Sequence, residues 1–267
     1  MRKYTIIALL IGLLVISIQP QAQDNPNTWQ PFDGDGTLRR VRVPILMYHY
    51  VSVLPPDADA IRRGLTLHPD IFRQHIDYFA TNNYTTISLY DLDDALENGT
   101  PLPENPVILT FDDGYLDAYT EVFPVLRDSG MTGTFFIPTQ FIDDNRVGYV
   151  NWAQINEMAQ AGMSMEGHSK THPALVERDF DFLVFEVMGS LESLLIHSGM
   201  IPRMFSYPAG RYDEDTLRFM ASTPVERAVT TQTGTIQTTT NRYELPRMRI
   251  TDETGVSGLI YLLTYQG

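Results

Sequence analysis

Short apolar runs alternate with segments whose apolar residues recur at helical spacing, and this pattern continues through most of the chain. Short, mostly apolar runs predict strands at 43–50, 85–89, 107–111, 132–137, 163–167, 204–207, 228–231 and 245–250. Apolar residues three and four positions apart predict helices at 70–81, 92–98, 116–126, 151–158, 182–195 and 213–221. The repeated order of strand and helix favours one α/β domain with a parallel sheet.

A closed barrel fits this pattern better than an open dinucleotide-binding sheet, because no glycine-rich phosphate loop follows any predicted strand. In α/β barrels, the reactive residues gather at the carboxyl ends of the strands. Polar residues that come directly after the apolar runs are therefore the first candidates for a functional site.

The first 22 residues have the pattern of an export signal. Arg2 and Lys3 precede an apolar run at 6–18, which is shorter than a comfortable membrane span. Ala22 is a candidate cleavage position, but Pro20 stands where a small residue is usual, so an uncleaved anchor is the alternative. We expect an exported protein that is extracellular, periplasmic or bound to the cell envelope. Membrane association is expected only through this segment.

Residues 23–42 are rich in Asp, Asn, Gly and Pro and show little periodicity, which predicts a linker. The folded domain is then expected at 43–267.

The chain has 33 acidic and 19 basic residues, a formal net charge of −14, and no cysteine. The charge argues against a nucleic-acid-binding protein, because phosphate contacts need clustered Lys and Arg. It also disfavours a strongly anionic polymer as substrate. Without cysteine, thiolate metal sites and a cysteine nucleophile are excluded, so His and carboxylate groups must supply any metal ligands.

Two adjacent carboxylates, Asp112 and Asp113, follow the predicted strand at 107–111. Placing both at the end of a buried strand is costly unless a positive charge lies beside them, and a divalent metal would supply that charge. One Asp can bind the metal while the other serves as a base. The alternative is an ordinary turn in which an Asp caps the next helix.

Two histidines, His168 and His172, follow the predicted strand at 163–167. Side chains four residues apart can bind one metal if the segment makes a helical turn. With Asp113 they would form a set of two imidazoles and one carboxylate, which suits Zn²⁺ and leaves positions open for water and substrate. Co²⁺, Ni²⁺ or Fe²⁺ could occupy the same ligands.

A third candidate segment, Tyr207-Pro208-Ala209-Gly210, ends the predicted strand at 204–207. Pro208 and Gly210 favour a rigid loop, in which the backbone N–H of Tyr207 or Ala209 could face a developing oxyanion. Taken alone, this segment would be an ordinary turn.

Taken together, these segments resemble the polysaccharide deacetylase family (carbohydrate esterase family 4), over roughly residues 44–250. The resemblance implies a distorted (β/α)7 barrel in the catalytic domain. It makes Asp112 the catalytic base and Asp113, His168 and His172 the metal ligands. It also implies that residues 207–210 line the substrate groove, with an oxyanion N–H from Tyr207.

The sequence departs from the family pattern in two places. The third segment has no Arg to orient the base, and the C-terminal segment 259–263 has no His to act as the acid. His49, in a Met-Tyr-His start similar to that of the poly-N-acetylglucosamine deacetylases, is the candidate acid, although a structural His is the alternative. Arg247, near the last predicted strand, is the candidate that orients Asp112, although a surface Arg is the alternative.

The resemblance therefore implies a metal-dependent hydrolase that removes N-acetyl groups from an N-acetylglucosamine-containing polysaccharide. Peptidoglycan, chitin-like oligomers and poly-N-acetylglucosamine all fit. One alternative is the same site acting on acetyl esters of a polysaccharide such as xylan. A non-catalytic carbohydrate-binding protein and an anchored structural protein of the envelope are further alternatives, and neither explains four intact site residues.

Overall fold

The computed structural model describes residues 36–266. Seven parallel strands form a closed barrel, because the pairing of β2 with β6 joins the two ends of the sheet. The strands follow one another around the ring as β2 (Ile45–Tyr48), β12 (Leu245–Arg249), β10 (Arg227–Thr233), β9 (Met204–Ser206), β8 (Ser164–Gly167), β7 (Thr134–Ile137) and β6 (Pro106–Phe111). Strand β5 (Thr85–Thr86) pairs only with the start of β6. The expected barrel of the α/β class is confirmed.

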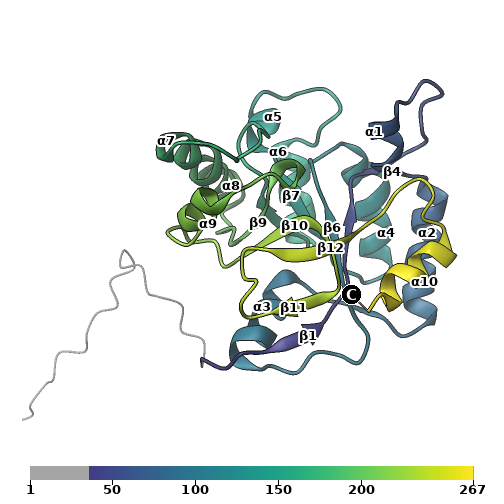
Figure 1. Ribbon diagram of the computed structural model, residues 1–267. Coiled ribbons are helices and arrows are strands. Elements are labelled where there is room, and N and C mark those ends of the chain that lie inside the picture. The colour runs from purple at the N-terminus through teal and green to yellow at the C-terminus, as the bar shows by residue number, and fades with distance from the viewer. Residues whose placement is uncertain (1–35, 267) are drawn as a thin grey trace, which may run out of the picture. The chain divides into compact units, whose positions relative to one another are not determined.

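Helices surround this barrel (Figure 1), and most of them coincide with predicted segments. They include α2 (Pro69–Thr81), α4 (Phe123–Asp128), α6 (Trp152–Gln160), α9 (Glu214–Met220) and α10 (Val256–Thr264). The predicted helix at 182–195 is a continuous helical segment of three parts: α7 (Phe180–Leu183), a π-helical turn η2 (Val184–Met188) and α8 (Gly189–Ser198). A second π-helical turn, η1 (Ala118–Val122), leads into α4.

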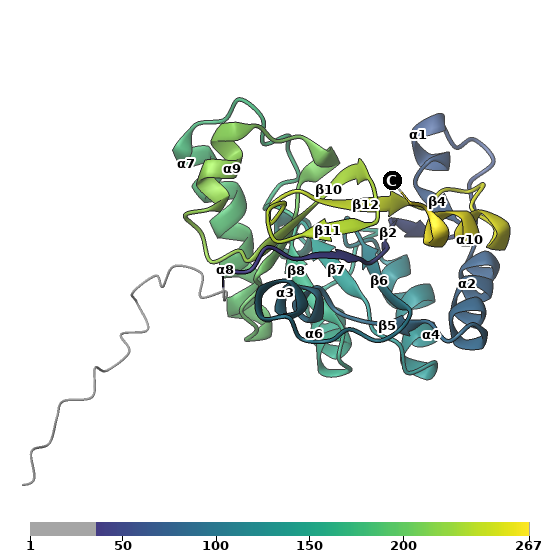
Figure 2. The same ribbon diagram turned by 60° about the horizontal axis from the view of Figure 1, so that its bottom comes forward.

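Alternation along the strands separates two apolar layers. Leu46, Leu109 and Phe135 pack outward against α2 and α4, whereas Ile45 and Ile108 belong to the interior cluster. Helix α3 (Leu89–Asn98) contributes to the interior cluster and lies below the strands in Figure 2. Because β2, β6 and β7 are buried on both faces, they read as nearly continuous apolar runs in the sequence.

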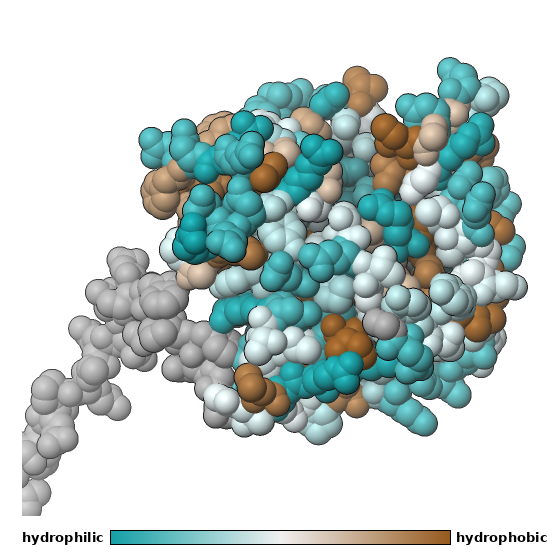
Figure 3. All heavy atoms as spheres, viewed as in Figure 1, coloured by the Kyte–Doolittle hydropathy of each residue, from teal (hydrophilic) through white to brown (hydrophobic). Residues whose placement is uncertain are grey.

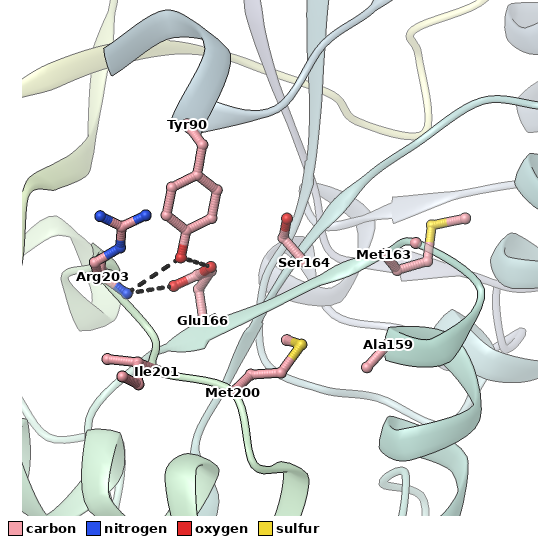
Figure 4. Close-up of a pocket in the computed structure, with 9 residues that line it drawn as sticks. Tyr90, Ala159, Met163, Ser164, Glu166, Met200, Ile201 and Arg203 are labelled. Carbon is pink, nitrogen blue, oxygen red and sulfur yellow. Dashed lines mark hydrogen bonds between the residues drawn. The ribbon is translucent and has the colours of Figure 1, made fainter. Parts of the chain in front are cut away.

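Helix α3 is also fixed by polar contacts at the amino-terminal end of the barrel. Tyr90 donates a hydrogen bond to the buried carboxylate of Glu166 at 2.6 Å, and the backbone N–H groups of Arg203 and Met204 donate to the same carboxylate at 3.0 and 2.9 Å. Tyr90, Glu166 and Arg203 border a pocket of about 370 Å³ (Figure 4). Both oxygens of Glu166 are therefore used in holding the helix and strand β9 together.

Several short elements were not predicted. Strand β1 (Arg40–Arg42) pairs antiparallel with β11 (Ile236–Thr238), so the end of the predicted linker is part of the fold and the start at Val43 is corrected. Strands β3 (Tyr50–Val51) and β4 (Thr66–Leu67) pair with each other. Helices α1 (Ala60–Arg63) and α5 (Thr139–Asp143) lie where no element was predicted, and the 3-10 turn η3 (Pro208–Gly210) lies in a segment predicted to be a loop.

The predicted export signal at 1–22 and the linker up to residue 35 lie outside the described residues. Within 36–266, no helix is both long enough and apolar enough to cross a membrane. On the face seen in Figure 3, hydrophobic residues lie in separate patches among hydrophilic ones.

Candidate metal centre and active site

Strand alternation brings the candidate residues to one end of the barrel interior. Ile108 belongs to the interior cluster, so Thr110 on the same strand, and Asp112 directly after the strand ends, face inward as well. Met204 and Leu245 belong to the same interior cluster. Ser206 and Arg247 each lie two residues further along the same strand, so they also face inward. The parallel strands all end at this rim, which is where barrel chemistry is expected.

Asp113, His168 and His172 form a compact set of possible metal ligands. One donor atom from each lies within 4.8 Å of the others. The Nε2 atoms of His168 and His172 lie 3.2 and 3.0 Å from Oδ1 of Asp113. Two ligands about 2.1 Å from one tetrahedral ion lie roughly 3.4 Å apart, so this spacing fits a single small divalent cation. The expected grouping of these three residues is present in the structure.

The backbone adopts left-handed conformations around these ligands. The φ angles are 75° at Asp113, 59° at Ser169 and 61° at His172, although none of the three is glycine. Each such conformation costs about 1 kcal/mol or more, and strain of this kind persists where surrounding contacts impose it. The two histidines are thus brought together by an irregular loop, not by the helical turn that their spacing suggested.

His168 is oriented by the backbone of the neighbouring strand. Its Nδ1 lies 2.7 Å from the carbonyl oxygen of Ser206, which accepts a hydrogen bond from the Nδ1–H tautomer and leaves Nε2 free to bind a metal. Burial lowers the pKa of His168, but the carboxylates of Asp113 and Asp112 outweigh it, so the pKa lies above its ordinary value. A metal that binds His168 must therefore displace a proton that His168 holds more tightly than usual.

Asp112 lies beside the ligand set and is paired with Arg247. The guanidinium donates two hydrogen bonds to the carboxylate, from Nη1 to Oδ1 at 2.8 Å and from Nη2 to Oδ2 at 2.7 Å. Ser206 Oγ also donates to Asp112, at 3.2 Å. Burial raises the pKa of Asp112, but the charge and hydrogen bonds of Arg247 outweigh it and lower the pKa to about 2. The carboxylate is therefore ionised at neutral pH and held in one orientation.

Arg247 is itself fixed by its surroundings. It is only 1% exposed, so the alternative that Arg247 lies on the surface is wrong. Its Nε donates to the carbonyl oxygen of Thr230 at 2.8 Å, and its Nη atoms also donate to Thr110 Oγ1 and Ser206 Oγ at 3.0 and 3.1 Å.

His49 lies at the same rim, between β2 and β3. Its Nε2 is 4.0 Å from Oδ2 of Asp112, and its buried Nδ1 has no hydrogen-bond partner in the described part of the chain. Burial lowers the pKa of His49 to about 4, although the charges of Asp112 and Asp113 act in the opposite direction. His49 is therefore neutral at neutral pH in the metal-free protein.

The segment 207–210 also reaches this rim. The N–H of Tyr207 donates to the carbonyl oxygen of Val229 at 3.4 Å, a long hydrogen bond, and the Tyr207 side chain is buried. Ala209 has a left-handed φ of 54°, and Pro208 to Gly210 form the turn η3. Gly210 is required here, because a Cβ would lie 2.1 Å from Oγ1 of Thr231.

Two neighbours of the site were given no role in the sequence analysis. Ser206 contacts Asp112 through its hydroxyl and His168 through its carbonyl, and its inward parity on β9 was the available signal. Tyr115, directly after Gly114, stacks on Tyr50 at a ring distance of 3.6 Å. Burial and the charge of Asp113 raise the pKa of Tyr115 above its ordinary range.

The remaining histidines and Trp152 lie apart from the ligand set. His75 is buried in α2 between Tyr48 Oη and the carbonyl oxygen of Thr254, at 3.1 and 2.9 Å. His68 caps the same helix by accepting a hydrogen bond from the Asp70 N–H. Trp152 stacks on His197 at 4.3 Å and donates to Asp143. These contacts are structural.

Comparisons with known proteins identify relatives of this chain. A family model described as polysaccharide deacetylase matches residues 99–228. YxkH of Bacillus subtilis (strain 168), which is assigned to the polysaccharide deacetylases by its name, is 30% identical over 222 residues, covering 83% of this chain and 75% of that protein.

Two further proteins are similar to this chain. The poly-beta-1,6-N-acetyl-D-glucosamine N-deacetylase of Escherichia coli (strain K12) is 26% identical over 157 residues, which are 54% of this chain and only 22% of that protein. The solved structure of the deacetylase PplD of Streptococcus pyogenes, in complex with acetate, has a TM-score of 0.79 and 28% identity, and covers 85% of this chain and 100% of that one.

Proposed function

Because this chain belongs to the polysaccharide deacetylase family, we propose that it is a metal-dependent hydrolase that removes N-acetyl groups from an N-acetylglucosamine-containing polysaccharide. The observation that carries the proposal is the placement of an ionised, oriented carboxylate, Asp112, directly beside a His-His-Asp ligand set.

Asp113, His168 and His172 would hold the cation. The donor set of two imidazoles and one carboxylate favours Zn²⁺, and Co²⁺, Ni²⁺ or Fe²⁺ have compatible ligand preferences. When bound, such a cation supplies Lewis acidity, which polarises a carbonyl group and lowers the pKa of water towards about 7. The Nδ1 hydrogen bond of His168 to Ser206 fixes the tautomer that this role needs.

Asp112 acts as the general base that takes a proton from the attacking water. Arg247 keeps the carboxylate ionised and sets its direction through two parallel hydrogen bonds. Arg247 thus replaces the Arg that is missing from the segment 205–208.

His49 protonates the leaving amine. Because its pKa is about 4, it must gain this proton during the reaction, and the nearest source is Asp112, at 4.0 Å, after that carboxylate has taken a proton from the attacking water. The tetrahedral oxyanion is stabilised by the N–H of Tyr207, whose present hydrogen bond to Val229 is long enough at 3.4 Å to be given up to a stronger acceptor.

The proposed substrate rests on similarity and on charge. The Escherichia coli relative acts, by its name, on poly-beta-1,6-N-acetyl-D-glucosamine, and a net charge of −14 suits a neutral polymer better than a polyanion. An exported location, suggested by the first 22 residues, would bring the protein to such a polymer.

Mass spectrometry of a substrate panel tests this proposal. The panel contains β-1,6- and β-1,4-linked N-acetylglucosamine oligomers, peptidoglycan fragments and acetylated xylan. We expect loss of acetyl groups from an N-acetylglucosamine substrate and none from xylan. Deacetylation of xylan alone would instead make the protein an acetyl esterase, and no deacetylation by metal-loaded protein would favour a non-catalytic carbohydrate-binding role.

A further inference from the structure

Glu186 is a buried carboxylate that has no part in the proposed reaction. It lies in the π-helical turn η2, between α7 and α8, and is 1% exposed. A carboxylate at this depth is costly unless strong donors surround it. The partners of Glu186 therefore indicate what it does.

All three hydrogen bonds that Glu186 accepts come from the loop that carries the metal ligands. The backbone N–H groups of Lys170 and Thr171 donate to Oε2 at 3.0 and 2.8 Å. The hydroxyl of Thr171 donates to Oε1 at 2.5 Å. The two donor residues lie between His168 and His172. The carboxylate therefore holds the middle of a segment whose two ends are the proposed metal ligands.

This loop needs such support because its backbone is strained. Ser169 and His172 both have left-handed φ angles, on either side of the residues that Glu186 holds. Ser169 Oγ accepts a hydrogen bond from the N–H of His172 at 2.9 Å, but this bond lies within the loop and does not fix it to the barrel. From outside the loop, the N–H of Gln140 donates one hydrogen bond to the Lys170 carbonyl oxygen at 2.8 Å, whereas Glu186 accepts three hydrogen bonds from Lys170 and Thr171.

The π-helical turn makes this contact compatible with helix packing. The N–H of Gly189 bonds to the carbonyl of Val184, five residues back, so the turn contains one extra residue. The extra residue changes the direction of side chains by about 100° relative to a regular helix. Val187 and Leu191 pack into the apolar cluster with Phe205, while Glu186 faces the metal-ligand loop.

We propose that Glu186 is a positioning residue for the metal centre: it holds the 168–172 loop in the conformation that brings both histidines onto one cation. The inference rests on the proposed metal site. It assigns Glu186 no contact with substrate or metal. Its role is to supply acceptor atoms at fixed positions, so the geometry of those atoms matters more than their charge.

The affinity of the full-length protein for Zn²⁺, measured by competition with a chelating dye, tests this inference without reference to activity. Glu186→Leu removes both acceptors and should raise the Kd for Zn²⁺ by about 10- to 100-fold, the usual cost of losing such a support. Glu186→Asp withdraws the carboxylate by about 1.5 Å and should give a smaller rise.

Glu186→Gln is the conservative variant that should rescue binding. Its amide oxygen can accept from both N–H groups, and its NH₂ group can donate to the Thr171 hydroxyl, so its Kd should stay within about threefold of that of the wild type. Glu192→Leu is the matched control, because Glu192 is an exposed residue on the following helix α8. Thermal unfolding of each variant identifies any that does not fold, and Glu186→Asp keeps the test valid if Glu186→Leu is one of them.

The inference is overturned if Glu186→Asp and Glu186→Leu bind Zn²⁺ as tightly as the wild type. It is also overturned if Glu186→Gln binds as weakly as Glu186→Leu, since charge would then matter and not acceptor geometry. Wild-type protein that binds no Zn²⁺ would contradict the metal site itself, which is a different outcome.

Discussion

Two buried arginines at opposite ends of the barrel provide a matched test of the catalytic assignment. Arg247 pairs with Asp112 at the carboxyl end, and Arg227 pairs with Asp93 and Glu97 of α3 at the amino-terminal end. Both guanidinium side chains are fully buried. They differ in what they hold: Arg247 orients the proposed base, whereas Arg227 only fixes a helix.

Replacing either arginine by methionine leaves a carboxylate without its cation. Removing one partner of a buried ion pair costs about 3–5 kcal/mol of stability, so Arg247→Met and Arg227→Met should both lower the free energy of unfolding by an amount of that order. Urea denaturation of the two variants measures this quantity. Arg247→Met also removes the two hydrogen bonds, at 2.8 and 2.7 Å, that direct Asp112.

The two variants should separate in activity. A positioned general base contributes about 10²–10⁴-fold to the rate, so Arg247→Met should lower kcat/KM for deacetylation by at least about 100-fold. Arg227→Met should stay within about threefold of the wild type, provided that both are assayed well below their unfolding temperatures. Equal losses in the two variants, or nearly full activity in Arg247→Met, would contradict the role of Arg247 in orienting the base.

Three further predictions concern single residues. Asp112→Asn should lower kcat by at least about 100-fold while the Kd for Zn²⁺ changes by less than about tenfold, and full activity in this variant would exclude Asp112 as the base. His172→Ala removes one of three ligands, so calorimetry should show strongly weakened Zn²⁺ binding, and unchanged binding would place the metal elsewhere. Burial raises the pKa of Asp117 to about 6, although Arg62 acts in the opposite direction. Because the folded state then holds this proton more tightly than the unfolded state, the contribution of Asp117 to stability is greatest below about pH 4 and is lost as pH rises through about 6. Asp117→Asn should remove up to about 3 kcal/mol of this decline between pH 4 and 8, and an unaltered decline in denaturation experiments would contradict the assignment.

Strands β2, β6 and β7 could be predicted because they are buried on both faces and therefore read as apolar runs. The positions of Asp112, Asp113 and His168 followed from the rule that barrel residues react at the carboxyl ends of strands. The pairing of Arg247 with Asp112 depended on more than this rule, since it requires β12 and β6 both to neighbour β2 in a closed ring. Sequence spacing alone does not encode that closure.

Other parts of the site have no signal at the level of the sequence. Glu186 lies within a segment that reads as one ordinary helix, and the π-helical turn that directs its side chain does not change the apolar pattern enough to be recognised. The spacing of His168 and His172 suggested a helical turn, but the residues between them are held by tertiary contacts in an irregular loop. Strand β1 was read as linker because its three residues gain their partner, β11, only from a distant part of the chain.

The most direct test of the central claim is acetate release from N-acetylglucosamine oligomers by the purified protein, measured before chelation, after chelation and after return of metal. We predict release that a chelator abolishes and that Zn²⁺ or Co²⁺ restores. Release that continues unchanged after the metal has been shown to be removed would contradict a metal-dependent deacetylase, as would no release from protein whose 113/168/172 site is shown to be loaded.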